Sequence, residues 1–231
     1  MTQVPLQSKV LSENQRIADS LRERYAANQI LCINLVSSPG SGKTTLLERT
    51  LEGFPPETRV AVLTGDIQTE RDAERLARFG FPVKQITTGG ICHLDGRMIE
   101  RALADWPLEQ LDLLLVENVG NLVCPSSYDL GEAAKVVVLS VTEGEEKPLK
   151  YPSMFFKSEL LVLNKIDLLK YVPFDMNAAK ENARKVHPEI EIIEVSSLNR
   201  DGMTEWFEWL NRKRHAFLAK LNTETSQPQQ A

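Results

Sequence analysis

The stretch that decides the fold is Ser38-Pro39-Gly40-Ser41-Gly42-Lys43-Thr44-Thr45. It follows Ile30–Val36, an apolar run of strand length, and it leads into Thr44–Arg49, which has helical character. A glycine-rich loop between a strand and a helix turns backbone N–H groups inward on an anion, and the helix N-terminus adds to the attraction. The sequence therefore predicts a phosphate-binding loop (P-loop).

Individual residues of this loop have expected roles. Lys43 should reach the β- and γ-phosphates of a nucleotide, and the Thr44 hydroxyl should bind Mg²⁺. The usual G-x-x-x-x-G-K-[ST] pattern has Gly where this chain has Ser37, and an ordinary glycine-rich turn is the alternative interpretation. The predicted phosphate-binding set is Pro39, Gly40, Ser41, Gly42, Lys43, Thr44 and Thr45.

A second loop predicts which base is bound. Asn-Lys-Ile-Asp at 164–167 follows the apolar run Glu159–Leu163, at the strand end that faces ligands in parallel sheets. The Asp167 carboxylate can accept from N1–H and the 2-amino group of guanine, a pattern that adenine lacks. Asn164 should tie this loop to the P-loop, and a backbone N–H after the run Glu191–Val195 should contact guanine O6. The predicted base-binding set is Asn164, Lys165, Asp167, Ser196, Ser197 and Leu198.

Two further strand-like runs end near carboxylates. Glu117 ends the run Leu111–Glu117, with Gly120 three residues later, and Asp66 follows the run Arg59–Thr64. We expect Asp66 and Glu117 to serve Mg²⁺ and the attacking water, and we expect the Gly120 N–H to sense the γ-phosphate. Which carboxylate has which role stays open, and a solvated loop carboxylate is the alternative for each. With Lys43, they form the predicted catalytic set.

Three side chains suggest a second metal site. Cys92 and His93 follow two glycines, and Cys124 lies just beyond Gly120. Thiolate and imidazole ligands suit Ni²⁺, Zn²⁺ or copper better than Mg²⁺. Three ligands leave a tetrahedral site one short, so a water or a second subunit would complete it. A small buried Cys beside an unrelated surface His is the alternative.

The spacing of apolar runs predicts an α/β fold of the P-loop NTPase type. A mostly parallel sheet of about seven strands should be covered by helices on both faces. The remaining expected strands are Val83–Thr87, Lys135–Val141 and Ile190–Val195, and the expected helices are Lys9–Ala27, Thr69–Phe79, His93–Asp105, Asp175–Val186 and Asp201–Leu221. We divide the chain into an N-terminal helical extension (1–29), a GTPase domain with the metal site (30–221) and a disordered tail (222–231).

Composition excludes several functional classes. The chain has 231 residues and a net charge of −5, which argues against nucleic acid as a partner. No apolar run approaches the length of a membrane span, and Met1–Val10 lacks the layout of a signal peptide. Three cysteines, Cys32, Cys92 and Cys124, do not make a disulfide framework. We therefore expect a cytoplasmic protein with no membrane partner.

Five motifs together resemble the HypB-type GTPase family, which serves nickel insertion during [NiFe]-hydrogenase maturation. The likeness covers roughly Leu31 to Leu210. Beside the P-loop and the Asn-Lys-Ile-Asp loop, it rests on Thr-Gly-Asp-Ile-Gln-Thr (Thr64–Thr69), Gly-Gly-Ile-Cys-His-Leu (Gly89–Leu94) and Glu-Asn-Val-Gly-Asn-Leu-Val-Cys-Pro (Glu117–Pro125). Some members carry an N-terminal Cys-rich or His-rich motif, whereas Met1–Ile30 contains neither Cys nor His. We therefore expect the metal site to lie in the GTPase domain.

The resemblance implies a GTP-dependent homodimer of the SIMIBI class with a metal site shared at the interface. Its Ni²⁺ or Zn²⁺ ligands would be Cys92, His93 and Cys124, and Asp66 and Glu117 would flank Mg²⁺. The implied partners are a hydrogenase maturation accessory protein and the hydrogenase large subunit precursor. The function expected is a GTP-hydrolysing metallochaperone whose nucleotide state gates the metal site. The alternatives are a urease-type nickel accessory GTPase, a small-molecule P-loop kinase and a non-catalytic module that only holds GTP.

Overall fold

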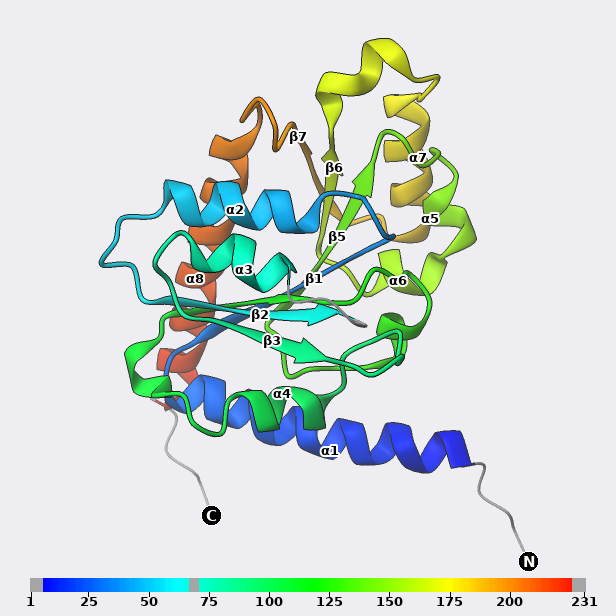
Figure 1. Ribbon diagram of the computed structural model, residues 1–231. Coiled ribbons are helices and arrows are strands. Elements are labelled where there is room, and N and C mark those ends of the chain that lie inside the picture. The colour runs from blue at the N-terminus through cyan, green and yellow to red at the C-terminus, as the bar shows by residue number, and fades with distance from the viewer. Residues whose placement is uncertain (1–5, 67–70, 226–231) are drawn as a thin grey trace, which may run out of the picture.

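The computed structural model describes residues 6–66 and 71–225 and contains one seven-stranded parallel sheet (Figure 1). The strand order is β3-β2-β4-β1-β5-β6-β7, and every neighbouring pair is parallel. The predicted fold class is therefore confirmed. The strands are β1 (Leu31–Ser37), β2 (Val60–Asp66), β3 (Val83–Thr87), β4 (Leu113–Glu117), β5 (Ala134–Ser140), β6 (Leu160–Asn164) and β7 (Glu191–Val195).

Helices cover both faces of the sheet, as its apolar strands require. The α-helices are α1 (Leu6–Ala27), α2 (Lys43–Gly53), α3 (Arg71–Ala77), α4 (Gly96–Ala102), α5 (Lys147–Lys150), α6 (Pro152–Phe156), α7 (Met176–Val186) and α8 (Met203–Thr225). Three 3₁₀ turns are η1 (Leu108–Gln110), η2 (Cys124–Ser127) and η3 (Ile166–Tyr171).

Alternating side chains of the strands build separate cores on the two faces. On one face, Ile33 and Leu35 of β1 pack with α2, α3 and α8, whose Trp206 and Trp209 are fully buried. On the opposite face, Cys32 packs with α1 and α4, while β5 and β6 pack with α6 and α7. This period-two alternation follows from strand geometry.

Several helix boundaries differ from those expected from the sequence. The helix expected from His93 begins at Gly96, because the Asp95 side chain caps it by accepting from the Met98 N–H at 2.8 Å. The helix expected from Thr69 is seen as α3, and residues 67–70 lie outside the described residues. The expected disordered tail is wrong at its start, since α8 continues through 222–225, and 226–231 lie outside the described residues.

The N-terminal helix is part of the core. Leu21 and Tyr25 of α1 are almost completely buried in the same cluster as Ile99 of α4. The segment expected as an extension therefore contributes apolar burial to the sheet. Within the residues that the structure describes, no helix is long and apolar enough to cross a bilayer.

A buried hydrogen bond between α2 and α8 supplies a stability prediction. The Trp206 indole N–H donates to Thr50 Oγ1 at 2.9 Å, and neither residue is exposed. Replacing Thr50→Val keeps the shape but leaves the indole N–H unpaired, which should cost about 1–3 kcal/mol in urea unfolding. The exposed Thr223→Val is the control and should change stability by less than about 0.5 kcal/mol. Equal stability of the two variants would contradict this account.

Candidate nucleotide and metal sites

The P-loop turns sharply between β1 and α2. Gly40 and Gly42 have φ values of 74° and 96°, the left-handed conformation that favours glycine. A side chain at Gly42 would also meet Asn164 Nδ2 at 2.5 Å. Lys43 is buried, and its Nζ donates to Ser37 Oγ at 2.6 Å. Ser37, the residue that departs from the usual pattern, therefore holds the Lys43 side chain by a hydrogen bond.

A cavity of about 490 Å³ lies over this loop. The predicted residues that line it are Pro39, Gly40, Gly42, Lys43, Thr44, Thr45, Asp66, Glu117, Gly120 and Lys165. Ser41 does not line it, and its single O–H lies within hydrogen-bond distance of two acceptors, Glu143 Oε1 at 2.6 Å and Ser38 O at 2.9 Å. The structure thus brings most of the predicted phosphate and Mg²⁺ residues to one cavity.

The end of β4 carries a buried carboxylate beside the P-loop. Glu117 Oε1 accepts from the Thr44 hydroxyl at 2.7 Å, and Glu117 Oε2 is buried with no hydrogen-bond partner among the described residues. Burial raises the pKa of Glu117 to about 7, with Lys43 opposing the shift. Burial in turn lowers the pKa of Lys43, and Glu117 opposes that shift. An orphaned carboxylate oxygen beside a hydroxyl fits the hard-oxygen preference of Mg²⁺.

Asp66 and Glu117 come from neighbouring strands. The register of β2 and β4 pairs Thr64 with Glu117, so Asp66 lies two residues beyond that pair and lines the same cavity. Both carboxylates therefore line one cavity with the P-loop. The geometry leaves their individual roles as predictions.

Asn164 joins the base loop to the P-loop. Its side chain is fully buried, and its Nδ2 donates to Ser41 O at 2.9 Å. Its Oδ1 accepts from the Ser197 backbone N–H at 3.3 Å and from the Ser197 hydroxyl at 2.9 Å. Lys165 has φ 63° and donates from Nζ to Gly40 O at 2.6 Å. The tie expected of Asn164 is therefore present, and it reaches the third loop as well.

The outer part of the base site is more open. Asp167 lies in η3, and its Oδ1 accepts from the Ser196 hydroxyl at 2.5 Å. Leu198 is 75% exposed, so its side chain does not line a closed pocket. Asp167, Ser196 and Leu198 are thus grouped at one sheet edge, and their contact with guanine stays a prediction.

Two cations that the sequence analysis did not assign to the site lie near the P-loop. Arg75 of α3 lines the cavity and pairs with Glu48 at 2.8 Å. Lys147 begins α5, and its Nζ lies 3.5 Å from Ser38 Oγ and 3.6 Å from Glu143. Only the fold brings them there, because neither belongs to a recognisable motif.

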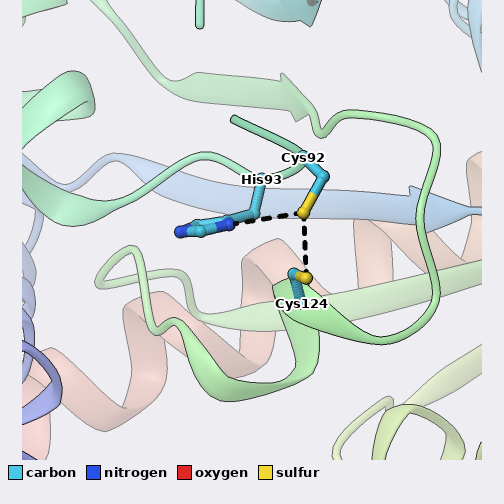
Figure 2. Close-up of side chains that lie close together, drawn as sticks. All are labelled: Cys92, His93 and Cys124. Atoms are coloured by element: carbon cyan, nitrogen blue, oxygen red, sulfur yellow. Dashed lines mark hydrogen bonds between the residues drawn. The ribbon is translucent and has the colours of Figure 1, made fainter. Parts of the chain in front are cut away.

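The predicted metal ligands converge. Figure 2 shows Cys92 and His93, from the loop before α4, facing Cys124 at the start of η2. The Sγ atoms of Cys92 and Cys124 lie 2.9 Å apart, and Cys92 Sγ lies 4.0 Å from His93 Nδ1. All three ligand atoms lie within 4.8 Å of one another, whereas Cys32 is buried in the core. The alternative of an unrelated Cys and His therefore loses its support.

The environment of this triad favours metal ligation. The His93 ring stacks on Tyr128 with centroids 3.8 Å apart, a contact that the sequence alone did not indicate. Burial lowers the pKa of His93, which favours the neutral imidazole that binds metals, while Asp95 opposes the shift. The hydrogen bond from Cys92, followed by burial, raises the pKa of Cys124. Metal binding would therefore displace a thiol proton.

One segment connects the two sites. A side chain at Gly120 would meet Pro39 Cα at 2.9 Å, so this residue packs directly on the P-loop. Immediately after it, Asn121 Nδ2 donates to Cys92 O at 3.3 Å, and Cys124 follows in η2. The segment Glu117–Cys124 therefore contacts the nucleotide cavity at one end and the metal triad at the other.

Comparisons with known proteins agree with this geometry. A family model described as CobW/HypB/UreG, nucleotide-binding domain, matches residues 31–194. The hydrogenase maturation factor HypB of Azotobacter chroococcum is 49% identical over 229 residues, which cover 98% of this chain and 74% of that protein. HypB of Escherichia coli K12 is 53% identical over 207 residues, which cover 90% and 71%. The crystal structure of Helicobacter pylori HypB in complex with nickel is similar with a TM-score of 0.83 at 42% identity, covering 88% and 96%.

The matched stretch 31–194 contains the P-loop, the metal triad and the Asn164–Asp167 loop. Relatives named HypB match nearly the whole chain, which favours this family over the small-molecule kinase alternative. The chain belongs to the HypB branch of the CobW/HypB/UreG nucleotide-binding family.

Proposed function

We propose that this protein is a GTP-hydrolysing metallochaperone that helps deliver nickel to [NiFe]-hydrogenase during maturation. The observation that carries this proposal is the shared segment Glu117–Cys124, which lines the nucleotide cavity and then supplies a metal ligand. Such a segment can respond to the nucleotide and move a ligand at the same time.

At the phosphate end, the chain's own groups hold and orient the nucleotide. Lys43 neutralises phosphate charge, and Thr44 and Glu117 supply oxygens for Mg²⁺, which would stabilise charge that develops on the phosphates. Asp66 lines the same cavity, which supports the proposal that it orients the attacking water or joins Glu117 at Mg²⁺. Arg75, which lines the cavity, can add positive charge if its pairing with Glu48 loosens.

Nickel is the cargo of the triad rather than a resident cofactor. Two thiolates and one imidazole form a site that suits Ni²⁺ and also Zn²⁺. Three ligands from one chain leave coordination positions open, so a water, a second copy or a receiving protein can complete the site. We propose a homodimer that hands the ion to an accessory protein and then to the hydrogenase large subunit precursor, in the cytoplasm.

The base-reading role of Asp167 predicts a change of substrate. Asp167→Asn replaces an acceptor oxygen with an amide donor, so the two hydrogen bonds to guanine are no longer both possible. GTP affinity should fall at least about 100-fold, equivalent to about 3 kcal/mol. Xanthine carries a carbonyl where guanine has its amino group, so XTP should become the better substrate.

Phosphate release with GTP, ATP and XTP measures this prediction in the wild type and the variant. The gain with XTP shows that the variant is folded. Unchanged preference for GTP would contradict the assignment of Asp167. A wild type that binds GTP but releases no phosphate with Mg²⁺ present would instead favour the non-catalytic module.

If Cys92, His93 and Cys124 bind nickel, replacing one of them should weaken nickel binding and spare nucleotide binding. Cys124→Ala removes a thiolate ligand and should weaken Ni²⁺ binding at least about 10-fold, while GDP affinity stays within about twofold. Cys32→Ala is the matched control, because Cys32 is equally a free thiol but lies in the core, away from the triad. Competition with a chromophoric chelator measures the nickel affinity. Equal nickel affinity in the two variants would show that the triad is not the site.

A further inference from the structure

The metal triad is built from two segments of the chain that lie on either side of α4 and β4. Cys92 and His93 precede α4, whereas Cys124 opens η2. Ligands from separate loops bind a metal tightly only if their supports hold them in place, since residues behind the ligands set their orientation. That support must come from the buried polar groups behind the triad.

The support behind His93 is the side chain of Asn118. Its Oδ1 accepts from the Leu94 N–H at 3.1 Å and from its own neighbour Val119 at 3.0 Å. Its Nδ2 donates to Asn34 Oδ1 at 3.2 Å. Asn118 and Asn34 are 1% and 0% exposed, so water does not compete for these bonds. The residue after His93 is thus tied to β1.

The support behind Cys124 continues from Asn34. Asn34 Nδ2 donates to Glu132 Oε1 at 3.1 Å, and the same carboxylate oxygen pairs with Lys135 Nζ at 3.3 Å. Lys135 Nζ in turn donates to Pro125 O at 3.3 Å. Glu132 Oε2 accepts from Leu130 N at 2.6 Å, so both carboxylate oxygens are used. The residue after Cys124 is thus tied to the same β1 side chain.

We propose that Asn118, Asn34, Glu132 and Lys135 form a positioning network that fixes the Cys124 turn relative to the Cys92-His93 loop. The inference rests on the proposed function of the triad as a metal site. A buried ion pair with side chains only 7% exposed is costly to desolvate and adds little net stability over apolar residues. The network instead holds the two loops in position. Its hydrogen bonds end on Leu94, which follows His93, and on Pro125, which follows Cys124.

Nearby polar contacts differ from this network. Lys157 Nζ also donates to the η2 turn, at Ser126 O with a distance of 2.8 Å, but Lys157 is exposed and water can replace its bond. Lys157→Met is therefore a matched control on the same turn. Thr50→Val is a second control, since it removes a buried hydrogen bond from the core between α2 and α8.

The test is the double variant Glu132→Gln/Lys135→Met, which removes both charges together and leaves neither buried alone. Ni²⁺ alone is titrated into the full chain loaded with GDP, with a competing chelator and with the near-ultraviolet absorption of nickel–thiolate bonds recorded. The nickel dissociation constant should rise at least about 10-fold and the absorption should weaken, because outer partners of ligands typically carry effects of about 10–100-fold. GDP affinity should stay within about twofold.

Lys157→Met and Thr50→Val should keep the nickel affinity and the absorption of the wild type. The proposal is overturned if the double variant binds nickel as the wild type does, or if Thr50→Val loses as much. If the double variant does not fold, Asn34→Ala takes its place in the same comparison with the same expected loss. A wild type whose nickel binding survives Cys124→Ala would instead overturn the proposed metal site itself.

Discussion

The position of β4 between β1 and β2 is the constraint on which the rest of the structure depends. Its register pairs Glu117 with Leu35 on one side and with Thr64 on the other. The carboxylate at the end of β4 therefore lies beside the P-loop that follows β1, and the chain that leaves β4 must cross that loop at Gly120. Because Cys124 lies four residues further on, the metal triad cannot be built independently of the nucleotide cavity.

This arrangement has a thermodynamic consequence. If the nucleotide state changes where the segment Glu117–Cys124 lies, then metal affinity differs between the states, and the metal changes nucleotide affinity by the same factor. A coupling of about 1–3 kcal/mol is typical for such linked sites. The hydrogen bond from Asn121 to Cys92 O and the bond from Leu94 N–H to the buried Asn118 side chain extend the segment's contacts to the loop that carries Cys92 and His93. Both loops that carry the triad can therefore move with the segment Glu117–Cys124.

Much of this could be predicted from sequence, because glycine-rich phosphate loops and strand-end carboxylates obey local rules. The P-loop and Glu117 follow from motif and strand order, whereas the spacing of Cys92 and Cys124 left their convergence as one of two interpretations. Contacts made by tertiary packing could not be predicted. Tyr128 stacks on His93, and Lys135 Nζ donates to Pro125 O, but no sequence motif indicates either contact. Helix ends were missed at Gly96, where the Asp95 cap decides the start of α4, and in residues 222–225, through which α8 continues.

The most direct measurement is the Ni²⁺ affinity of the protein loaded with GDP and, separately, with a non-hydrolysable GTP analogue and Mg²⁺. The account predicts affinities that differ by at least about fivefold, the lower end of typical allosteric coupling. It also predicts that the difference disappears when Cys124 is replaced. Equal nickel affinities in the two nucleotide states would contradict gating of the metal site by GTP.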